Sequence, residues 1–257
     1  MRGIAISLVT VSLILSVLIG LSLHRGGLTG NDGRTEATGG KQPNKSGRER
    51  PLIGLSLDTL KEARWMRDRD IFTRRVQELG GDVEVLSAGS DDATQIRNVM
   101  SFITKRVDVL VIVPHDGKVM AKAVAEAHKA GIPVIAYDRL ITNCDLDLYI
   151  SFDNIKVGEA QAKYLVEHLP TPGKGRIVRI YGAPTDNNAK LFKMGQDRVL
   201  KPYIERGDIV VLHENWATDW KPDKAKDIMI AAITKYGQAI DAVLASNDGT
   251  AGGAIQA

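Results

Sequence analysis

The stretch DVLVIVPHDGKVMAKAVAEAHKAGIPVIAYDR, residues 108–139, decides the fold of this chain. Its two ends, 108–113 and 132–137, are apolar runs that predict buried strands, and 118–129 between them carries apolar residues at helical spacing. Gly131, with a proline two residues later, ends the helix in the usual way. A strand, a helix and a second strand in this order predict two parallel strands joined by a right-handed crossover.

The same alternation continues over the chain from residue 51 onward. The other expected strands are 52–57, 82–87, 148–152, 176–181, 208–213 and 241–246. The other expected helices are 63–79, 93–104, 155–168, 188–206 and 224–236. This order predicts a Rossmannoid α/β fold with parallel sheets. We expect two similar lobes, 51–153 and 154–257, that face each other through the ends of their strands.

Five of the apolar runs stop at polar residues. These residues are Asp58, His115 and Asp116, Asp138 and Arg139, Asp186 to Asn188, and Asn247 and Asp248. In open α/β sheets, ligands bind at the carboxyl ends of the parallel strands. We therefore predict a site for a small polar molecule between the two lobes.

Composition and charge exclude several other functions. The 257 residues are 44% hydrophobic and carry a net charge of only +3, as globular proteins commonly do. The densest basic stretch, 64–75, also contains Asp68 and Asp70, so we interpret it as a solvated helix face and expect no nucleic-acid partner. The single cysteine, Cys144, rules out an intrachain disulfide. The histidines lack metal-ligand spacing, so we expect no metal and no cofactor, and we interpret His115 as a loop residue.

The first 50 residues differ from the rest. Residues 4–23 form an uncharged apolar run that is long enough to cross a bilayer. No small-residue cleavage pattern and no cysteine for lipid attachment follow it, so we interpret 1–23 as a signal-anchor, with a cleavable signal peptide as the alternative. Residues 24–50 are rich in glycine and polar residues, which predicts a flexible tether.

Several motifs resemble, in the same order along the chain, those of one protein family. They are Glu62-Ala63-Arg64-Trp65, Ala136-Tyr137-Asp138-Arg139, Tyr149–Asn154, Asp186–Phe192, Trp216 with Trp220, and Ala245–Ala254. This ordered set, spread over 51–257, resembles the D-xylose-binding proteins, two-lobed receptors of the periplasmic-binding-protein type that close over one pyranose. The resemblance implies sugar contacts from Arg64, Trp65, Asp138, Arg139, Asp186, Asn188, Trp220 and Asn247.

The chemistry of these residue types suits a sugar. Hydroxyl groups both donate and accept hydrogen bonds, so a buried sugar site needs carboxylates, amides and guanidinium groups. Indoles can cover the apolar face of the ring, and we expect Trp65 and Trp220, one from each lobe, to enclose it. Structural roles remain open: the tryptophans could pack on lobe surfaces, Asp138 could cap a turn, and Asp186 or Asn188 could cap a helix.

Three functions remain open. The resemblance implies an extracytoplasmic protein, in the periplasm or on the outer face of the membrane, that passes D-xylose to an ABC-type permease. The apolar run 4–23 favours the alternative, a membrane-anchored xylose sensor that signals to a partner such as a histidine kinase. A glycosidase that uses Asp138 and Asp186 is disfavoured, because the family is non-catalytic and the strand tips are rich in amides and arginine. We therefore expect no enzymatic activity. Family members continue beyond the last residue of this chain, so we expect an incomplete second lobe.

Overall fold

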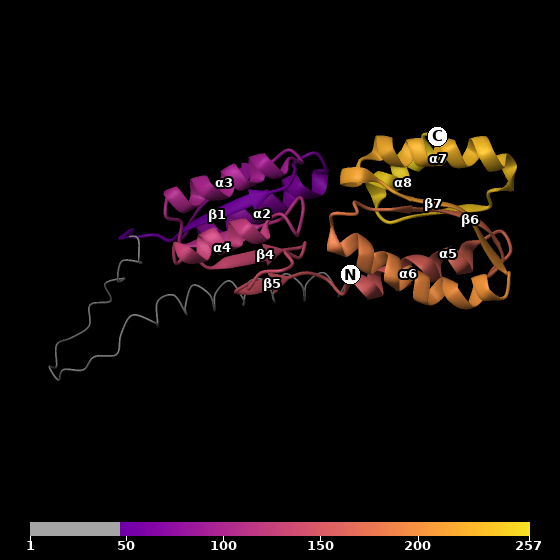
Figure 1. Cartoon of the computed structure of the whole chain (residues 1–257), viewed down its shortest axis with the longest axis horizontal. Coiled ribbons are helices and arrows are strands. Elements are labelled where there is room, and N and C mark those ends of the chain that lie inside the picture. Colours follow the sequence, from indigo (N-terminus) through magenta and orange to yellow (C-terminus); the bar gives the residue numbers. More distant parts are fainter. Residues whose placement is uncertain (1–46) are drawn as a thin grey trace.

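The computed structural model describes residues 47–257, which form two α/β lobes side by side (Figure 1). The predicted membrane segment, and the predicted tether up to residue 46, lie outside the described residues. Within residues 47–257, no helix combines the length and the apolar character needed to cross a membrane. The expected two-lobed α/β fold with parallel sheets is confirmed.

The first lobe is built on a parallel sheet of five strands in the order β2-β1-β3-β4-β5. The strands are β1 (Leu52–Leu57), β2 (Asp82–Ser87), β3 (Val109–Ile112), β4 (Val134–Tyr137) and β5 (Leu148–Ile150). The helices are α2 (Ala63–Glu78), α3 (Asp92–Thr104) and α4 (Ala121–Lys129). Because β2 and β3 lie on opposite sides of β1, the strand order reverses between β1 and β3, where sheets of this kind bind ligands.

The second lobe is built on a parallel sheet of three strands in the order β7-β6-β8. The strands are β6 (Gly175–Tyr181), β7 (Ile209–Trp216) and β8 (Ala242–Ala245). The helices are α5 (Asn154–His168), α6 (Asn187–Glu205), α7 (Pro222–Tyr236) and α8 (Asp248–Ile255), with short 3₁₀ turns η1 (Thr218–Trp220) and η2 (Gly237–Ala239). Here the strand order reverses between β6 and β8.

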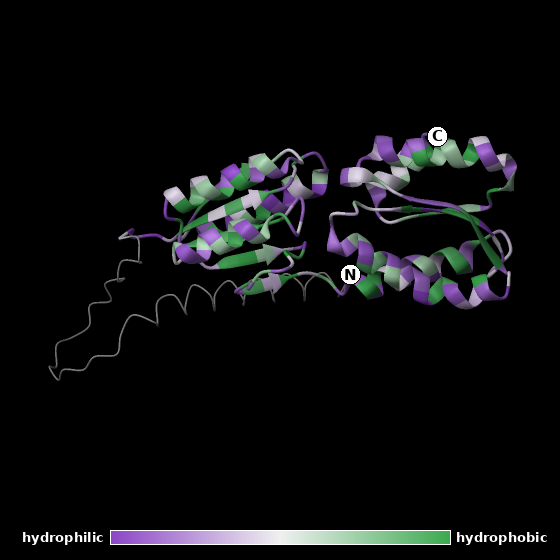
Figure 2. Ribbon diagram, viewed as in Figure 1, coloured by the Kyte–Doolittle hydropathy of each residue, from purple (hydrophilic) through white to green (hydrophobic). Residues whose placement is uncertain are grey.

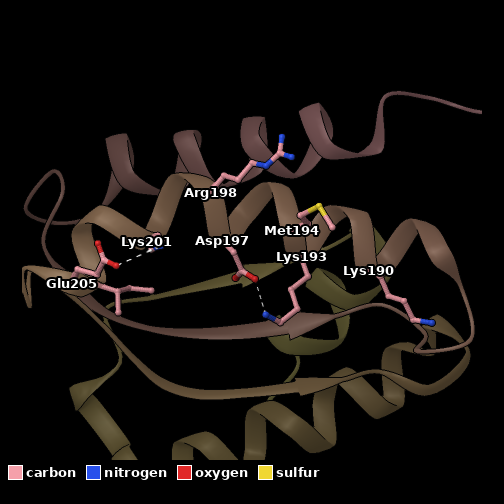
Figure 3. A pocket seen from close by; sticks show the side chains of 8 residues that line it. Lys190, Lys193, Met194, Asp197, Arg198, Lys201 and Glu205 are labelled. Carbon is pink, nitrogen blue, oxygen red and sulfur yellow. Dashed lines mark hydrogen bonds and ion pairs between the residues drawn. The ribbon is translucent and has the colours of Figure 1, made fainter.

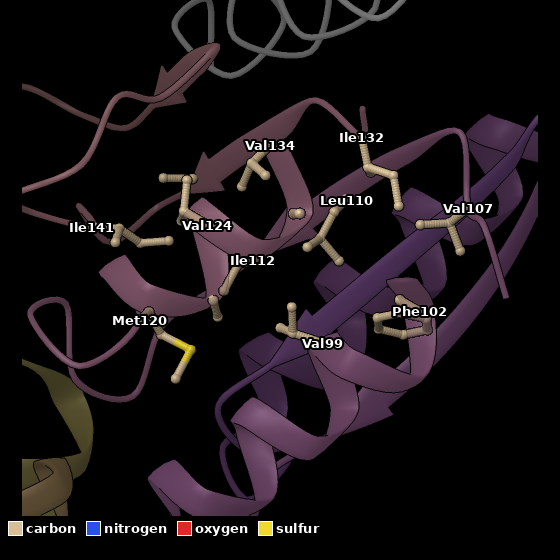
Figure 4. Close-up of a cluster of buried hydrophobic side chains, with 13 residues drawn as sticks. Val99, Phe102, Val107, Leu110, Ile112, Met120, Val124, Ile132, Val134 and Ile141 are labelled. Carbon is tan, nitrogen blue, oxygen red and sulfur yellow. The ribbon is translucent and has the colours of Figure 1, made fainter. Parts of the chain in front are cut away.

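Both faces of the first sheet are covered, which explains why its strands β3 and β4 are continuously apolar. Along β3, Leu110 and Ile112 pack with α3 and α4, whereas Val111 packs with α2 on the opposite face. Figure 4 shows the cluster against α3 and α4. Figure 2 shows the consequence along the chain: the strands are mainly hydrophobic, and the helices alternate between hydrophobic and hydrophilic residues.

The second sheet is also covered on both faces. Ile177 packs with α5 and α6, whereas Val178 and Ile180 pack with α7. Helices α5 and α6 approach each other closely because two glycines, Gly158 in α5 and Gly195 in α6, lie at their contact. A Cβ on Gly195 would lie 2.0 Å from the carbonyl oxygen of Ile155, so only glycine fits there.

Two predicted boundaries are wrong by three residues, more than any other boundary, and both lie at strand tips. The helix expected over 118–129 begins at Ala121, because Asp116 Oδ1 accepts hydrogen bonds from the N–H groups of Lys118 and Val119 and holds this segment in a turn. The strand expected over 208–213 continues to Trp216, which pairs with the last residue of β6. The additional turn and the longer strand both shape the space between the lobes.

Candidate functional site

A cavity lies between the two lobes, at the ends of their strands. Its lining residues are Glu62, Arg64, Trp65, Asp138, Arg139, Phe152, Asp186, Asn188, Phe192, Trp220 and Asn247. All eight residues that the sequence predicts as sugar contacts are therefore brought together. The cavity volume of about 90 Å³ is below the range of about 300–1,000 Å³ found for drug-sized ligands, so the cavity suits a small molecule.

Asp138, directly after β4, is the polar centre of the cavity. Its backbone adopts a left-handed conformation with φ of 64°, and its N–H donates to the carbonyl oxygen of Ile150 at 2.8 Å. The buried carboxylate accepts hydrogen bonds from Arg64 through Oδ2 and from Asn188 Nδ2 through Oδ1, the latter at 3.0 Å. Because Asn188 belongs to the second lobe, Asp138 joins the two lobes rather than capping its own turn.

Arg139 is buried between carboxylates of both lobes. Its Nη1 donates to Asp58 Oδ2 at 2.8 Å, and its Nε lies 3.0 Å from Asp186 Oδ2. Burial lowers the pKa of Arg139, but the charges of Asp186 and Asp58 raise this pKa by more, so the guanidinium stays charged. The planar guanidinium is thereby fixed at the cavity wall in one orientation.

Asp186 takes the capping role that the sequence left open, and both Asp186 and Asn188 line the cavity. Asp186 is the N-cap of α6, since its Oδ1 accepts from the N–H of Asn188 at 2.9 Å. Its other oxygen, Oδ2, faces Arg139 and accepts from Trp220 Nε1 at 3.1 Å. Burial raises the pKa of Asp186, and Arg139 opposes this shift. The amide of Asn188 accepts from Asn154 Nδ2 at 3.0 Å and donates to Asp138.

The two predicted aromatic walls come from different lobes. Trp65, near the start of α2, is 4% exposed and has the Arg64 guanidinium 4.1 Å from its ring centroid. Trp220, at the end of η1, is 6% exposed and contacts Phe192 edge-to-face at 6.2 Å between centroids. A Cβ on Gly182 would lie 2.1 Å from the Trp220 ring, so glycine is required for the indole to occupy this place. Both indoles are buried at the cavity rather than packed on an outer surface.

Asn247 is the N-cap of α8 and also lines the cavity. Its Oδ1 accepts from the N–H of Thr250 at 2.8 Å, and the two residues form a reciprocal capping box. Within the described residues, Asn247 Nδ2 makes no hydrogen bond, so this donor is available to a ligand.

Three lining residues were not predicted as contacts: Glu62, Phe152 and Phe192. Each lies inside a motif that carries the family resemblance, which is the signal that could have found them. Glu62 Oε2 is buried and makes no hydrogen bond with any residue of the described range 47–257. A buried acceptor without a partner is costly, so a hydroxyl donor at this wall would be stabilising.

A second depression runs along α6 (Figure 3). Its lining comes from α6 alone and consists largely of charged residues that pair along the helix, such as Lys193 with Asp197 at 2.7 Å. Such pairs are typical of a solvated helix face. Within residues 47–257, no cluster of three or more metal-ligating side chains is present.

A polar and aromatic cleft between two Rossmannoid lobes defines the class of periplasmic binding proteins. Residues 53–257 match the family described as "Periplasmic binding protein domain", and the chain belongs to this family. The D-xylose-binding periplasmic protein of Haemophilus influenzae is 51% identical to the chain over 205 residues. The resemblance to D-xylose-binding proteins is thereby confirmed. The match covers 80% of this chain and 61% of that relative, so the chain spans about three fifths of the relative's length.

Two solved structures extend the comparison. An ABC transporter solute-binding protein from Clostridium phytofermentans, with bound β-D-glucose, has a TM-score of 0.75 and 34% identity, over 80% of this chain and 67% of that chain. The fructose-binding periplasmic domain of a hybrid two-component system has a TM-score of 0.72 and 30% identity, over 80% of this chain and 66% of that chain. All three proteins are named as binding proteins or domains.

Proposed function

We propose that this protein binds a monosaccharide, D-xylose, in the cavity between its lobes and passes it to an ABC-type sugar permease outside the cytoplasm. One observation carries the proposal: the eight residues expected to contact the sugar line a single cavity at the strand tips of both lobes. The named substrate of the Haemophilus relative supports D-xylose as the ligand. The proposed role is binding and release without chemistry.

The geometry of the charged groups favours a polyhydroxylated ligand. Two guanidinium groups are held in place by carboxylates, Arg64 by Asp138 and Arg139 by Asp58 and Asp186. Groups fixed before binding lose little conformational freedom when a ligand arrives, which favours affinity. Guanidinium donors, carboxylate and amide acceptors and two indoles match the hydroxyl rim and the apolar face of a pyranose.

Calorimetric titration of the chain with D-xylose, D-ribose, D-glucose and D-galactose tests the proposal. We expect heat of binding with D-xylose and a weaker response or none with the others. Preference for another of these sugars would correct the specificity only. An absence of heat with all four, from protein shown to be folded by circular dichroism, would contradict the proposal.

A second function, that of a membrane-anchored sugar sensor, is favoured by two observations. The fructose-binding domain of a two-component system has the same fold, and residues 4–23 form an apolar run of membrane-spanning length. In this division of the chain, 1–23 anchors the protein, 24–50 tethers it, and 51–153 and 154–257 form the lobes. Mass spectrometry of the amino terminus in membrane and soluble fractions distinguishes the sensor from the importer. An intact amino terminus in the membrane fraction favours the sensor, and a soluble form that begins after residue 22 favours the importer.

A further inference from the structure

His115 connects the two lobes outside the cavity. It follows β3 in the first lobe, and its ring nitrogens contact one carboxylate from each lobe. Nδ1 lies 2.9 Å from Asp92 Oδ1, at the start of α3, and Nε2 lies 3.1 Å from Asp219 Oδ1, in η1 of the second lobe. The side chains of His115 and Asp219 are 13% and 15% exposed. None of the three residues lines the cavity, so this contact is separate from the proposed sugar site.

The Asp219 side of this contact is held in an unusual backbone conformation. Asp219 and Trp220 both have left-handed backbones, with φ of 54° and 58°. Such angles cost free energy in residues other than glycine and persist only where the surroundings stabilise them. Here Lys221 Nζ binds Asp219 Oδ2 at 2.7 Å while His115 binds Oδ1. The contact therefore also fixes the turn that presents the Trp220 indole to the cavity.

The protonation state of His115 decides whether both contacts are hydrogen bonds. An imidazolium donates from both ring nitrogens, whereas a neutral imidazole has one donor and one acceptor and would leave one carboxylate without a bond. The charged groups around the ring are Asp58, Asp91 and Asp92 of the first lobe and Asp219 of the second, with Lys221 on the far oxygen of Asp219. Because four carboxylates and only one lysine surround the imidazole, its charged form is favoured.

We propose that His115 is a proton-dependent latch between the lobes: its imidazolium donates to Asp92 and Asp219 when the cleft is closed, and loss of the proton breaks one bond and favours opening. Burial of the ring lowers the pKa of His115, and the hydrogen bonds to Asp92 and Asp219 with the charge of Asp58 raise it by more. Because this pKa is raised in the closed state, the stabilisation is complete at acidic pH and is lost as pH rises through it. The latch itself is a contact between the lobes and does not depend on the ligand. Only its predicted effect on D-xylose affinity rests on the proposed function.

An NMR titration of the histidine rings in the full chain tests the contact itself. In Asp219→Asn, we expect the pKa of His115 to fall, because a carboxylate of the opposite lobe has been removed. His128 is the internal control, because it is paired with Asp147 in the first lobe at 2.8 Å and does not contact Asp219. Asp219→Gly provides a second variant, since glycine accepts the left-handed backbone at no cost. An unchanged pKa of His115 in both variants, with a lower pKa in Asp92→Asn, would place the ring against the first lobe only and overturn the latch.

The pH dependence of affinity tests the consequence. Between about pH 5 and pH 8, where histidine titrates, D-xylose affinity of the wild type should fall as pH rises, and that of His115→Gln should show a much smaller fall. Equal pH profiles for the two proteins would contradict the latch. If neither protein binds any of the four sugars, the proposed function fails, and the NMR titration still decides whether His115 joins the lobes.

Discussion

Arg139 Nε and Asp186 Oδ2 lie 3.0 Å apart across the two lobes, with side chains that are only 7% and 3% exposed. Asp58 contacts the same guanidinium from the first lobe at 2.8 Å. Taking one cation and two carboxylates out of water is costly unless they bind one another. Removing any one of Arg139, Asp58 and Asp186 would therefore leave a buried charge without its partner. Arg139 thus links the packing of the lobes to the wall of the proposed sugar site.

Replacing Arg139 with methionine should therefore strongly destabilise the fold. The substitution keeps much of the side-chain volume but leaves Asp58 and Asp186 buried without a cation, and breaking such a pair typically costs about 3–5 kcal/mol. Urea unfolding measures this loss. Arg198→Met is the matched control, because its pair with Glu159 is exposed and worth less than about 1 kcal/mol. Equal stabilities of the two variants would show that the buried group does not contribute as described.

Tryptophan fluorescence should change when D-xylose binds, and the change should come from Trp65 and Trp220. Both indoles line the cavity, whereas Trp216 lies outside it against Tyr181, with 4.8 Å between ring centroids. We expect Trp216→Phe to retain the sugar-dependent change and Trp220→Phe to lose a large part of it. A signal that disappears in Trp216→Phe and persists in Trp220→Phe would contradict the assignment.

Two substitutions of Asn247 separate its capping role from its ligand role. Asn247→Asp keeps an oxygen that caps α8 but loses the Nδ2 donor, so stability should stay near wild type while sugar affinity falls. Loss of one buried hydrogen bond costs about 1–3 kcal/mol, or roughly ten- to a hundredfold in affinity. Asn247→Ala should lose both the helix cap and the Nδ2 donor. It should therefore bind D-xylose more weakly and also lose about 0.5–2 kcal/mol of stability. If Asn247→Asp binds D-xylose with wild-type affinity, the Nδ2 of Asn247 does not contact the sugar.

The substitution Gly195→Ala, which adds a methyl group, should destabilise the second lobe. Its Cβ would lie 2.0 Å from the carbonyl oxygen of Ile155, which would push α5 and α6 apart, and overpacking of this kind costs about 1–3 kcal/mol. Gly252→Ala is the control within the same lobe, because, apart from its neighbours along α8, no atom of the described residues lies within 4 Å of its Cβ position. That substitution should stabilise the protein by about 0.5–1 kcal/mol. Thermal unfolding of both variants measures the difference, and equal melting temperatures would contradict the close helix contact.

The strand-and-helix order and the residues at the strand tips could be predicted because both depend on local patterns. Apolar runs such as Val109–Ile112 are buried on both faces, and the polar residues after them meet where parallel strands end. Capping was foreseen for Asp186 as one of two open roles, and it occupies only one oxygen. Phe152 was missed because its side chain is apolar and so does not stand out among the polar residues at the strand ends. In the structure this side chain is 63% exposed.

The contact between His115 and Asp219 could not be predicted, because it depends on how the lobes meet. The two residues are 104 positions apart, and neither belongs to a recognisable pair in the sequence. The left-handed backbone of Asp219 also has no sequence signal, since glycine is the residue expected there. His115 was interpreted as a loop residue, which describes its backbone but not the partner that its ring contacts.

A crystal structure of the chain grown with D-xylose tests the central claim most directly. We predict one pyranose in the cavity between Trp65 and Trp220, with its hydroxyl groups bound by Asp138, Asn188 and the two cavity arginines. Sugar bound at another surface, or a cavity that excludes D-xylose while the lobes keep the fold described above, would contradict the account.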